Sequence, residues 1–228
     1  STIITGVDSS FDRKHQVMSR QPELIVWGAG TSRTLRVHWM LAELNLEYDN
    51  KKVGPRTGET QTEAYKAINP KGKIPVLVHG DLIISESFAI ARYLRRTFKG
   101  LTFDQHQLSP EGVARFDELA SFMLMELDAT SLYIIRRHLD LASIYGEAPN
   151  AVMSAKAYFC KMLGEGFTAS GLAEFVWGHC FSELDILLTT ILDWADAVGI
   201  ALPKHCYAYR HRMHQRPGFL LGKTNNKP

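Results

Sequence analysis

The sequence has few cysteines, no long apolar run and almost no net charge. Its three cysteines lie far apart, at Cys160, Cys180 and Cys206. An odd number without short spacings argues against a disulfide framework or a zinc ribbon, so we expect a reducing compartment, the cytoplasm. No apolar run reaches the roughly 18 residues of a transmembrane helix, which argues against a membrane-spanning segment.

The charge balance argues against a nucleic-acid partner. The formal net charge is only +2, from 26 basic and 24 acidic residues, so no broad basic surface is predicted. His211 and His214 have the spacing of a metal-binding pair. Because they stand alone among arginines, they indicate a solvated helix face instead. We therefore expect no metal site.

What the sequence does contain is enough apolar material for a sizeable core. Hydrophobic residues make up 45% of the 228 positions, which suffices for one large domain or two smaller ones. Residues 1–22 have no apolar stretch long enough for a signal peptide, and we interpret them as a flexible tail. Residues 23–99 then alternate strand and helix patterns, in the order β-α-β-(α)-β-β-α.

The second half of the chain is helical in character. Residues 100–110 have no periodic pattern and indicate a linker, and residues 111–228 form an all-helical region. We expect one bent helix or two helices over 111–146. Ser182 and Asp185 form an S-x-x-D capping box before an apolar run. A last helix over 203–217 is expected to stop at Pro217-Gly218. Two domains, α/β and all-α, are therefore predicted.

The stretch "NPKGKIPVLVHGDLIISESFAI" (69–90) carries chemistry at both ends of a predicted hairpin. Pro75 suits a strand edge in the trans form, whereas a cis bond would present the N–H and C=O of Ile74 to an extended peptide. Ser87 lies in the first turn of a helix, where a carboxylate is favoured, and Glu86 suits an ammonium. The pair could hold an amino-acid head group, or could be a plain cap beside a solvated acid.

These features together resemble the cytosolic glutathione S-transferase family. "NPKGKIPVL" and "SESFAIARYL" look like its glutathione-binding hairpin and helix, and "FSELDILLTTILDWA" resembles its C-terminal capping-box helix. The resemblance implies a thioredoxin-like N-terminal domain, an all-α C-terminal bundle and a homodimer. It also implies glutathione as co-substrate, with its main chain on Ile74, its γ-glutamyl head on Glu86 and Ser87, and its glycine end near Lys73.

The turn "GAGTSRTLRV" is where the resemblance expects a group that stabilises the glutathione thiolate. No tyrosine or cysteine lies between Trp27 and Trp39, so the chain resembles bacterial-type members with serine or threonine there. Ser32 and Thr31 both fit, and a third possibility is stabilisation by backbone N–H groups or Arg33. We also expect an electrophile pocket between the domains, with Trp39, Tyr133 and Arg137 as candidate walls.

The function implied is glutathione transfer to a small, often hydrophobic electrophile, in detoxification. Related chemistry with the same thiolate, namely hydroperoxide reduction, dehalogenation or ether cleavage, stays open because the pocket selects the electrophile. The alternative from another class is a carrier or assembly module that binds glutathione without activating its sulfur.

Overall fold

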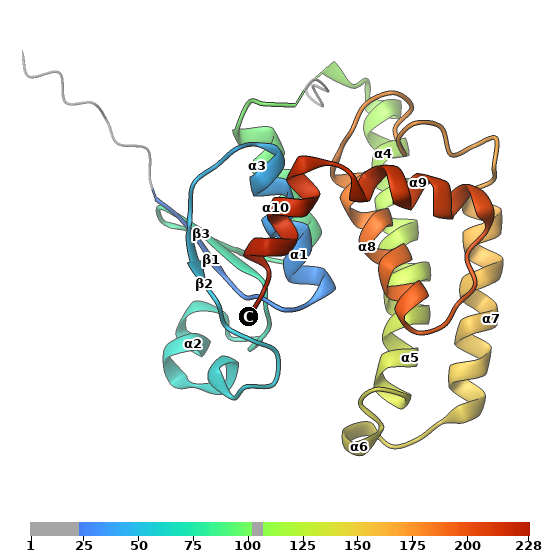
Figure 1. Cartoon of the computed structure of the whole chain (residues 1–228). Helices are drawn as coiled ribbons and strands as arrows, with labels where there is room; N and C mark the ends of the chain where they lie inside the picture. Colours follow the sequence, from blue (N-terminus) through green and yellow to red (C-terminus); the bar gives the residue numbers. More distant parts are fainter. Residues whose placement is uncertain (1–22, 102–106) are drawn as a thin grey trace, which may run out of the picture.

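The computed structural model of the protein describes residues 23–101 and 107–228. The predicted tail (1–22) and part of the predicted linker (100–110) lie outside these residues. The described chain forms an α/β half (23–101) followed by a helical half (107–228), shown in Figure 1. This arrangement confirms the predicted fold class, while the domain boundaries stay predictions.

The α/β half is built on a four-stranded mixed sheet in the order β2-β1-β3-β4. The central strand β1 pairs parallel with β2 and antiparallel with β3, and β3 and β4 form the predicted hairpin. Helices α1 and α3 pack together beside the sheet. The elements are β1 (Leu24–Trp27), α1 (Ser32–Glu43), β2 (Asp49–Lys51), η1 (Glu59–Gln61), α2 (Glu63–Ile68), β3 (Val76–His79), β4 (Leu82–Ser85) and α3 (Ser87–Thr97).

The helical half surrounds one largely buried helix, α8, whose side chains pack on α1 and α3 of the α/β half. Three of its elements, α4, η3 and α5, form one continuous helical run where a bent helix or two helices were expected. The elements are α4 (Pro110–Phe122), η3 (Met123–Leu132), α5 (Tyr133–His138), α6 (Ala142–Tyr145), α7 (Pro149–Gly166), α8 (Glu183–Ala197), α9 (Lys204–His214) and α10 (Pro217–Asn225).

The segment η3 is π-helical, with wider turns than an α-helix. The N–H of Tyr133 donates to the carbonyl of Asp128, five residues earlier. The hydroxyl of Ser131 donates to the carbonyl of Glu126 at 2.6 Å. π turns change the rotation of the helix after them and occur often at functional sites. This segment therefore bears on where α5 points its side chains.

The predicted capping box of α8 is confirmed. Ser182 accepts from the Leu184 N–H at 3.2 Å, and Asp185 accepts from the Ser182 N–H at 2.8 Å. The other carboxylate oxygen of Asp185 accepts from the Val176 N–H at 2.8 Å and from the Tyr209 hydroxyl at 2.6 Å. Burial raises the pKa of this carboxyl to about 6. The box thus fastens α8 to α9 and to the loop before it.

The end of the chain differs from the expectation that the last helix stops at Pro217-Gly218. Helix α9 does end just before it, but Pro217 begins a further helix, α10. Proline at the first helical position costs no hydrogen bond and presets φ, so the same residue ends one helix and opens the next. Helix α10 returns to the α/β half and packs along α1, as Figure 1 shows.

Candidate glutathione site

The turn between β1 and α1 holds the two predicted hydroxyl residues in different states. Thr31 is the N-cap of α1. Its Oγ1 accepts from the Thr34 N–H at 3.0 Å, and its N–H donates to Thr34 Oγ1 at 2.9 Å. Ser32 is the first residue of the helix, half-buried, and its hydroxyl makes no hydrogen bond within the described residues. Thr31 Oγ1 also lies 3.1 Å from Thr34 Oγ1, which can accept its proton. Thr31 is therefore engaged within the turn, while the Ser32 hydroxyl is available.

Gly28 lets this turn approach the Lys73-Ile74-Pro75 segment closely. Its φ is +123°, a conformation that side-chain-bearing residues rarely adopt. A Cβ at this position would lie 2.7 Å from the Cβ of Ile74 and 2.9 Å from a methyl of Thr34. The glycine thus sets the distance between the turn that carries Ser32 and the main chain of Ile74.

The last described residues of the chain hold the same turn from the other side. The Oδ1 of Asn226 accepts from the Thr34 hydroxyl at 2.6 Å, and its amide donates to the Thr31 carbonyl at 3.0 Å. The Gly30 N–H donates to the Asn226 carbonyl at 2.8 Å. Sequence reasoning missed this contact because it depends on α10, which it did not predict.

The Lys73-Ile74-Pro75 segment precedes β3, and its Ile74–Pro75 bond is cis. The Lys73 carbonyl accepts from the Tyr65 hydroxyl at 2.6 Å and from the Asn69 amide at 2.9 Å. No hydrogen bond of the Ile74 main chain occurs within the described residues. The segment is therefore fixed by its neighbours, while the main-chain groups of Ile74 have no hydrogen-bond partner among the described residues.

Glu86 and Ser87 lie at the start of α3 in contrasting environments. Glu86 has a φ of +72°, and its exposed carboxylate pairs with Lys71 Nζ at 2.7 Å. Ser87 is buried, and its Oγ accepts from Arg36 Nη1 at 3.3 Å. Because Ser87 accepts this bond, its own proton can still be donated to a ligand.

Arg36 connects Ser87 to the helical half. Its guanidinium donates to Thr190 of α8 at 2.9 Å and to Asp128 of η3 at 2.7 Å. Arg33 reaches the other oxygen of Asp128 at 2.5 Å. Burial raises the pKa of Asp128, but the charges of Arg36 and Arg33 outweigh burial, and the net pKa is lowered. Asp128 is therefore an ionised partner for both arginines.

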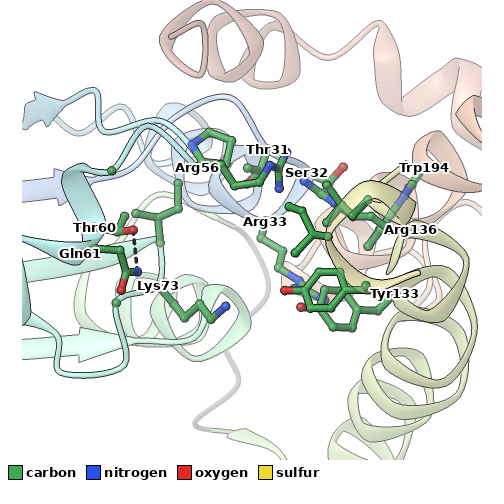
Figure 2. Close-up of a pocket in the computed structure, with 17 residues that line it drawn as sticks. Thr31, Ser32, Arg33, Arg56, Thr60, Gln61, Lys73, Tyr133, Arg136 and Trp194 are labelled. Atoms are coloured by element: carbon green, nitrogen blue, oxygen red, sulfur yellow. Dashed lines mark hydrogen bonds between the residues drawn. The ribbon is translucent and has the colours of Figure 1, made fainter. Parts of the chain in front are cut away.

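Two neighbouring cavities contain most of the predicted site residues. The Ser32 cavity, of about 420 Å³, is lined by Thr31, Ser32, Lys73 and Tyr133, among others. Figure 2 shows these side chains around the opening between the two halves. The Ser87 cavity, of about 620 Å³, is lined by Pro75, Glu86 and Ser87 among others. Arg33, Lys73, Ile74 and Tyr133 line both, so the two cavities form one extended groove.

Two of the three residues predicted to wall the electrophile pocket lie elsewhere. Trp39 is fully buried against Phe219 of α10 and donates to Glu43 at 2.8 Å, because α10 covers that face of α1. Arg137 is exposed and stacks on Tyr145, and its neighbour Arg136 faces the cavity instead. Tyr133 does line the cavity. Sequence reasoning missed three further residues that line it, Arg56, Trp194 and Arg136. For Arg136 the reason is that helical phase alone does not predict which side of α5 faces the cavity.

His211 and His214 of α9 each contact a neighbouring side chain. His214 contacts Asp193 at 2.8 Å and stacks on Phe219, while His211 contacts Gln215. Within residues 23–101 and 107–228, no cluster of three metal-ligating side chains occurs. None of the helices described is long and apolar enough to cross a membrane.

Comparison with known proteins agrees with this fold and places the chain in a family. A family model described as "Glutathione S-transferase, N-terminal domain" matches residues 22–96. Glutathione S-transferase 4 of Zea mays is 33% identical over 159 residues, covering 61% of this chain and 69% of that protein. Glutathione S-transferase A of Pleuronectes platessa is 34% identical over 76 residues, 33% of this chain and 34% of that protein.

Solved structures extend the likeness in fold over most of the chain. A theta class glutathione S-transferase from Xanthomonas axonopodis pv. citri, with glutathione bound, superposes with a TM-score of 0.76 at 24% identity. The match covers 88% of this chain and 97% of that one. Glutathione transferase F7 of Populus trichocarpa gives a TM-score of 0.74 at 22% identity, covering 90% and 100%.

The fold is therefore that of a thioredoxin-like domain followed by a helical region. The chain belongs to the glutathione S-transferase family, on the strength of the Zea mays relative. Across four other curated relatives, the matched region spans only 34% to 57% of the relative's length. We therefore infer the activity and substrates from the geometry of the site and not from these relatives.

Proposed function

We propose that the protein is a glutathione transferase, which binds the tripeptide along the groove formed by the two cavities and transfers the glutathionyl group, through its sulfur, to a small electrophile. The observation that carries this proposal is the position of Ile74. It lines both cavities, while Ser87 lines one and Ser32 the other. An extended peptide on the Ile74 main chain would place its amino-acid head toward Ser87 and its thiol toward Ser32.

The γ-glutamyl head would bind at the start of α3. The helix N-terminus, the free proton of Ser87 and the positive charge of Arg36 all favour a carboxylate there. The Glu86 carboxylate would bind the ammonium of the γ-glutamyl head. That ammonium would join or replace Lys71 as its partner. Lys73 directly precedes Ile74, whereas Glu86 and Ser87 follow it. The exposed ammonium of Lys73 suits the glycine carboxylate of glutathione.

Ser32 would stabilise the thiolate. A thiol of pKa near ~8.5 is mostly protonated at neutral pH, and a donated hydrogen bond at a helix N-terminus lowers that pKa. The Ser32 hydroxyl has no partner within the described residues, whereas Thr31 is engaged with Thr34. This difference favours Ser32 over Thr31, and Arg33 is already paired with Asp128. In a substitution, the S–C bond forms as the leaving group departs with its electron pair.

The test is whether bound glutathione is ionised and whether it reacts. The ultraviolet absorbance of thiolate, measured at pH 7 on the saturated protein, should exceed that of free glutathione. A panel of aryl halides, epoxides, enones and hydroperoxides then identifies the reaction class. Binding without a thiolate band and without turnover of any member would support the carrier or assembly module instead.

A homodimer in the cytoplasm, acting in detoxification, completes the proposal. The α/β half of one subunit would pack on the helical half of the other. Ile83 of β4 and Met125 of η3 are 50% and 58% exposed, one on each half, as such a contact requires. Light scattering of the protein and of Ile83→Lys tests this, since the charge should shift the mass toward the monomer. An unchanged mass would argue against a contact at β4.

A further inference from the structure

Among the described residues, the Ser32 cavity is lined by four cationic side chains and by no acidic one. Arg33, Arg56, Lys73 and Arg136 all contribute to its wall, and none of the described residues lining it is acidic. Figure 2 shows these cations around one opening, with Arg56 on the α/β side and Arg136 on the helical side. Such a concentration of one sign attracts and orients anions.

Two of these cations are accounted for by other groups. Arg33 forms an ion pair with Asp128 of η3. Lys73 lies along the proposed peptide path and suits the glycine carboxylate of glutathione. Arg136 differs from both, because its guanidinium has no hydrogen bond or ion pair within the described residues. Asp140 lies within electrostatic range of it but does not line the cavity.

Arg136 is half-buried, so the lack of a carboxylate in contact with its guanidinium among the described residues is unfavourable. Burial and the charges of Arg56 and Arg33 lower its pKa. A guanidinium partly removed from water and facing two like charges gains from an anionic partner, and its planar donors fit a carboxylate in two-point contact. Arg136 lines the cavity, so an incoming molecule bound there can supply the anionic partner.

The surroundings of Arg136 are aromatic and apolar. Its guanidinium lies 5.8 Å from the ring centre of Trp194, and Arg33 lies 5.7 Å from the same ring. Tyr133, Leu141 and Ile144 complete this side of the cavity. An aromatic body could pack on these side chains while its acidic group met Arg136.

We propose that the second substrate is an electrophile that carries a carboxylate on an aromatic or apolar body, and that Arg136 is the residue selecting it. The inference rests on the proposed transferase function and defines its substrate class. Glutathione alone does not explain Arg136, because Arg136 lies across the opening from Lys73 (Figure 2) and does not line the Ser87 cavity at the start of α3.

The binding test uses an unreactive pair of ligands, para-toluate and para-toluamide, which differ chiefly in charge. Calorimetric titrations are run on the protein alone and on protein saturated with S-methylglutathione, which occupies the peptide site, including the glycine subsite. Toluate should bind at least about tenfold tighter than toluamide in both cases, as a charge-assisted contact worth about 1.4 kcal/mol requires. Equal affinities would overturn the proposal.

Variants assign the preference to one residue. Arg136→Gln should remove the preference for toluate, and Arg136→Lys should retain part of it. Arg115→Gln removes the same charge from exposed α4, where Arg115 pairs with Glu118, and should leave the preference unchanged. A preference that survives in Arg136→Gln would contradict the role of this residue.

Turnover separates this inference from the transferase proposal. The pair is para-(chloromethyl)benzoate and its methyl ester, each rate divided by the uncatalysed rate with glutathione. In both, the thiol proton goes to solvent, the C–S bond forms and chloride leaves with its electron pair. We expect the acid to be preferred by about tenfold. Preference for the ester would reject the anionic substrate but leave transfer intact. No turnover of either, together with none across the electrophile panel and no thiolate band, would reject transfer, while the titrations still decide the anion site.

Discussion

Arg36 and Asp128 form a buried ion pair that joins the two halves of the protein. Nη2 of Arg36 lies 2.7 Å from Oδ2 of Asp128, and the two side chains are 2% and 3% exposed. The same guanidinium contacts Ser87 at the proposed glutathione head site. The orientation of Ser87 is thereby linked to the packing of η3, so a change to this pair should affect stability and binding together.

Asp128→Asn should destabilise the protein by roughly 3–5 kcal/mol, because it leaves the buried guanidinium of Arg36 without its counter-charge. Urea denaturation followed by circular dichroism measures the loss. Asp117→Asn is the matched control, since the Asp117 pair with Arg92 is on the surface and such pairs contribute about 1 kcal/mol or less. Equal effects of the two variants would show that the buried pair has no special role.

Ser32→Ala should reduce turnover by roughly 10²–10³ with a smaller change in glutathione affinity, as expected for loss of one anion-stabilising donor. Thr31→Val should instead lower stability by about 1 kcal/mol through the lost N-cap, with a lesser effect on turnover. Steady-state kinetics and thermal unfolding of both variants distinguish the roles. The reverse ranking in turnover would move the assignment to Thr31.

Glu86→Ala should raise KM for glutathione more than it lowers kcat, since the ammonium loses a partner used in the ground and transition states alike. Lys71→Ala is the matched change on the other side of the same exposed pair. Because it frees the Glu86 carboxylate, KM should stay unchanged or fall. A fall in kcat at constant KM in Glu86→Ala would argue against the binding role.

Asn226→Ala should lower kcat by about tenfold, because the turn that positions Ser32 loses the contacts to Thr34 and Thr31. Hydrogen exchange of the Gly30 and Thr34 amides, measured by NMR, should accelerate in parallel. Lys227→Ala changes the next residue and should affect neither. Normal activity together with faster exchange would show that the Asn226 contacts stabilise the turn without contributing to catalysis.

The raised pKa of Asp185 predicts that the stability of the protein depends on pH. Its pKa is raised from about 3.9 in the unfolded chain to about 6 in the folded protein. The folded state therefore binds the proton more tightly. This group's contribution is fully present below pH 3.9 and is lost as pH rises through 6, amounting to roughly 3 kcal/mol. NMR titration of the Asp185 carboxyl should show a midpoint near 6, and a midpoint near 4 would contradict the assignment.

Features set by local sequence were predictable here. The Ser182 and Asp185 capping box derives from a three-residue spacing, and caps depend on neighbours only. The hairpin around Gly80 and the helix after Glu86 derive from similar short-range patterns. These elements contain much of the proposed glutathione site, which explains why its residues lie along one groove.

Features set by distant contacts were not predictable. Pro217 has the same local signature whether it ends a helix or begins one, so α10 and the Asn226 contacts were missed. Arg136 rather than Arg137 faces the cavity. Hydrophobic periodicity assumes a regular helix, whereas the π turns of η3 change the rotation of the residues that follow. Trp39 was expected at the cavity because α10, which buries it, was not predicted.

The return of the chain's end to the Gly30 turn affects how the protein should be handled in the laboratory. A Cβ on Gly30 would lie 3.2 Å from the Pro228 ring, so an affinity tag fused after Pro228 would emerge beside the groove. Kinetic constants from such a fusion would partly describe the tag.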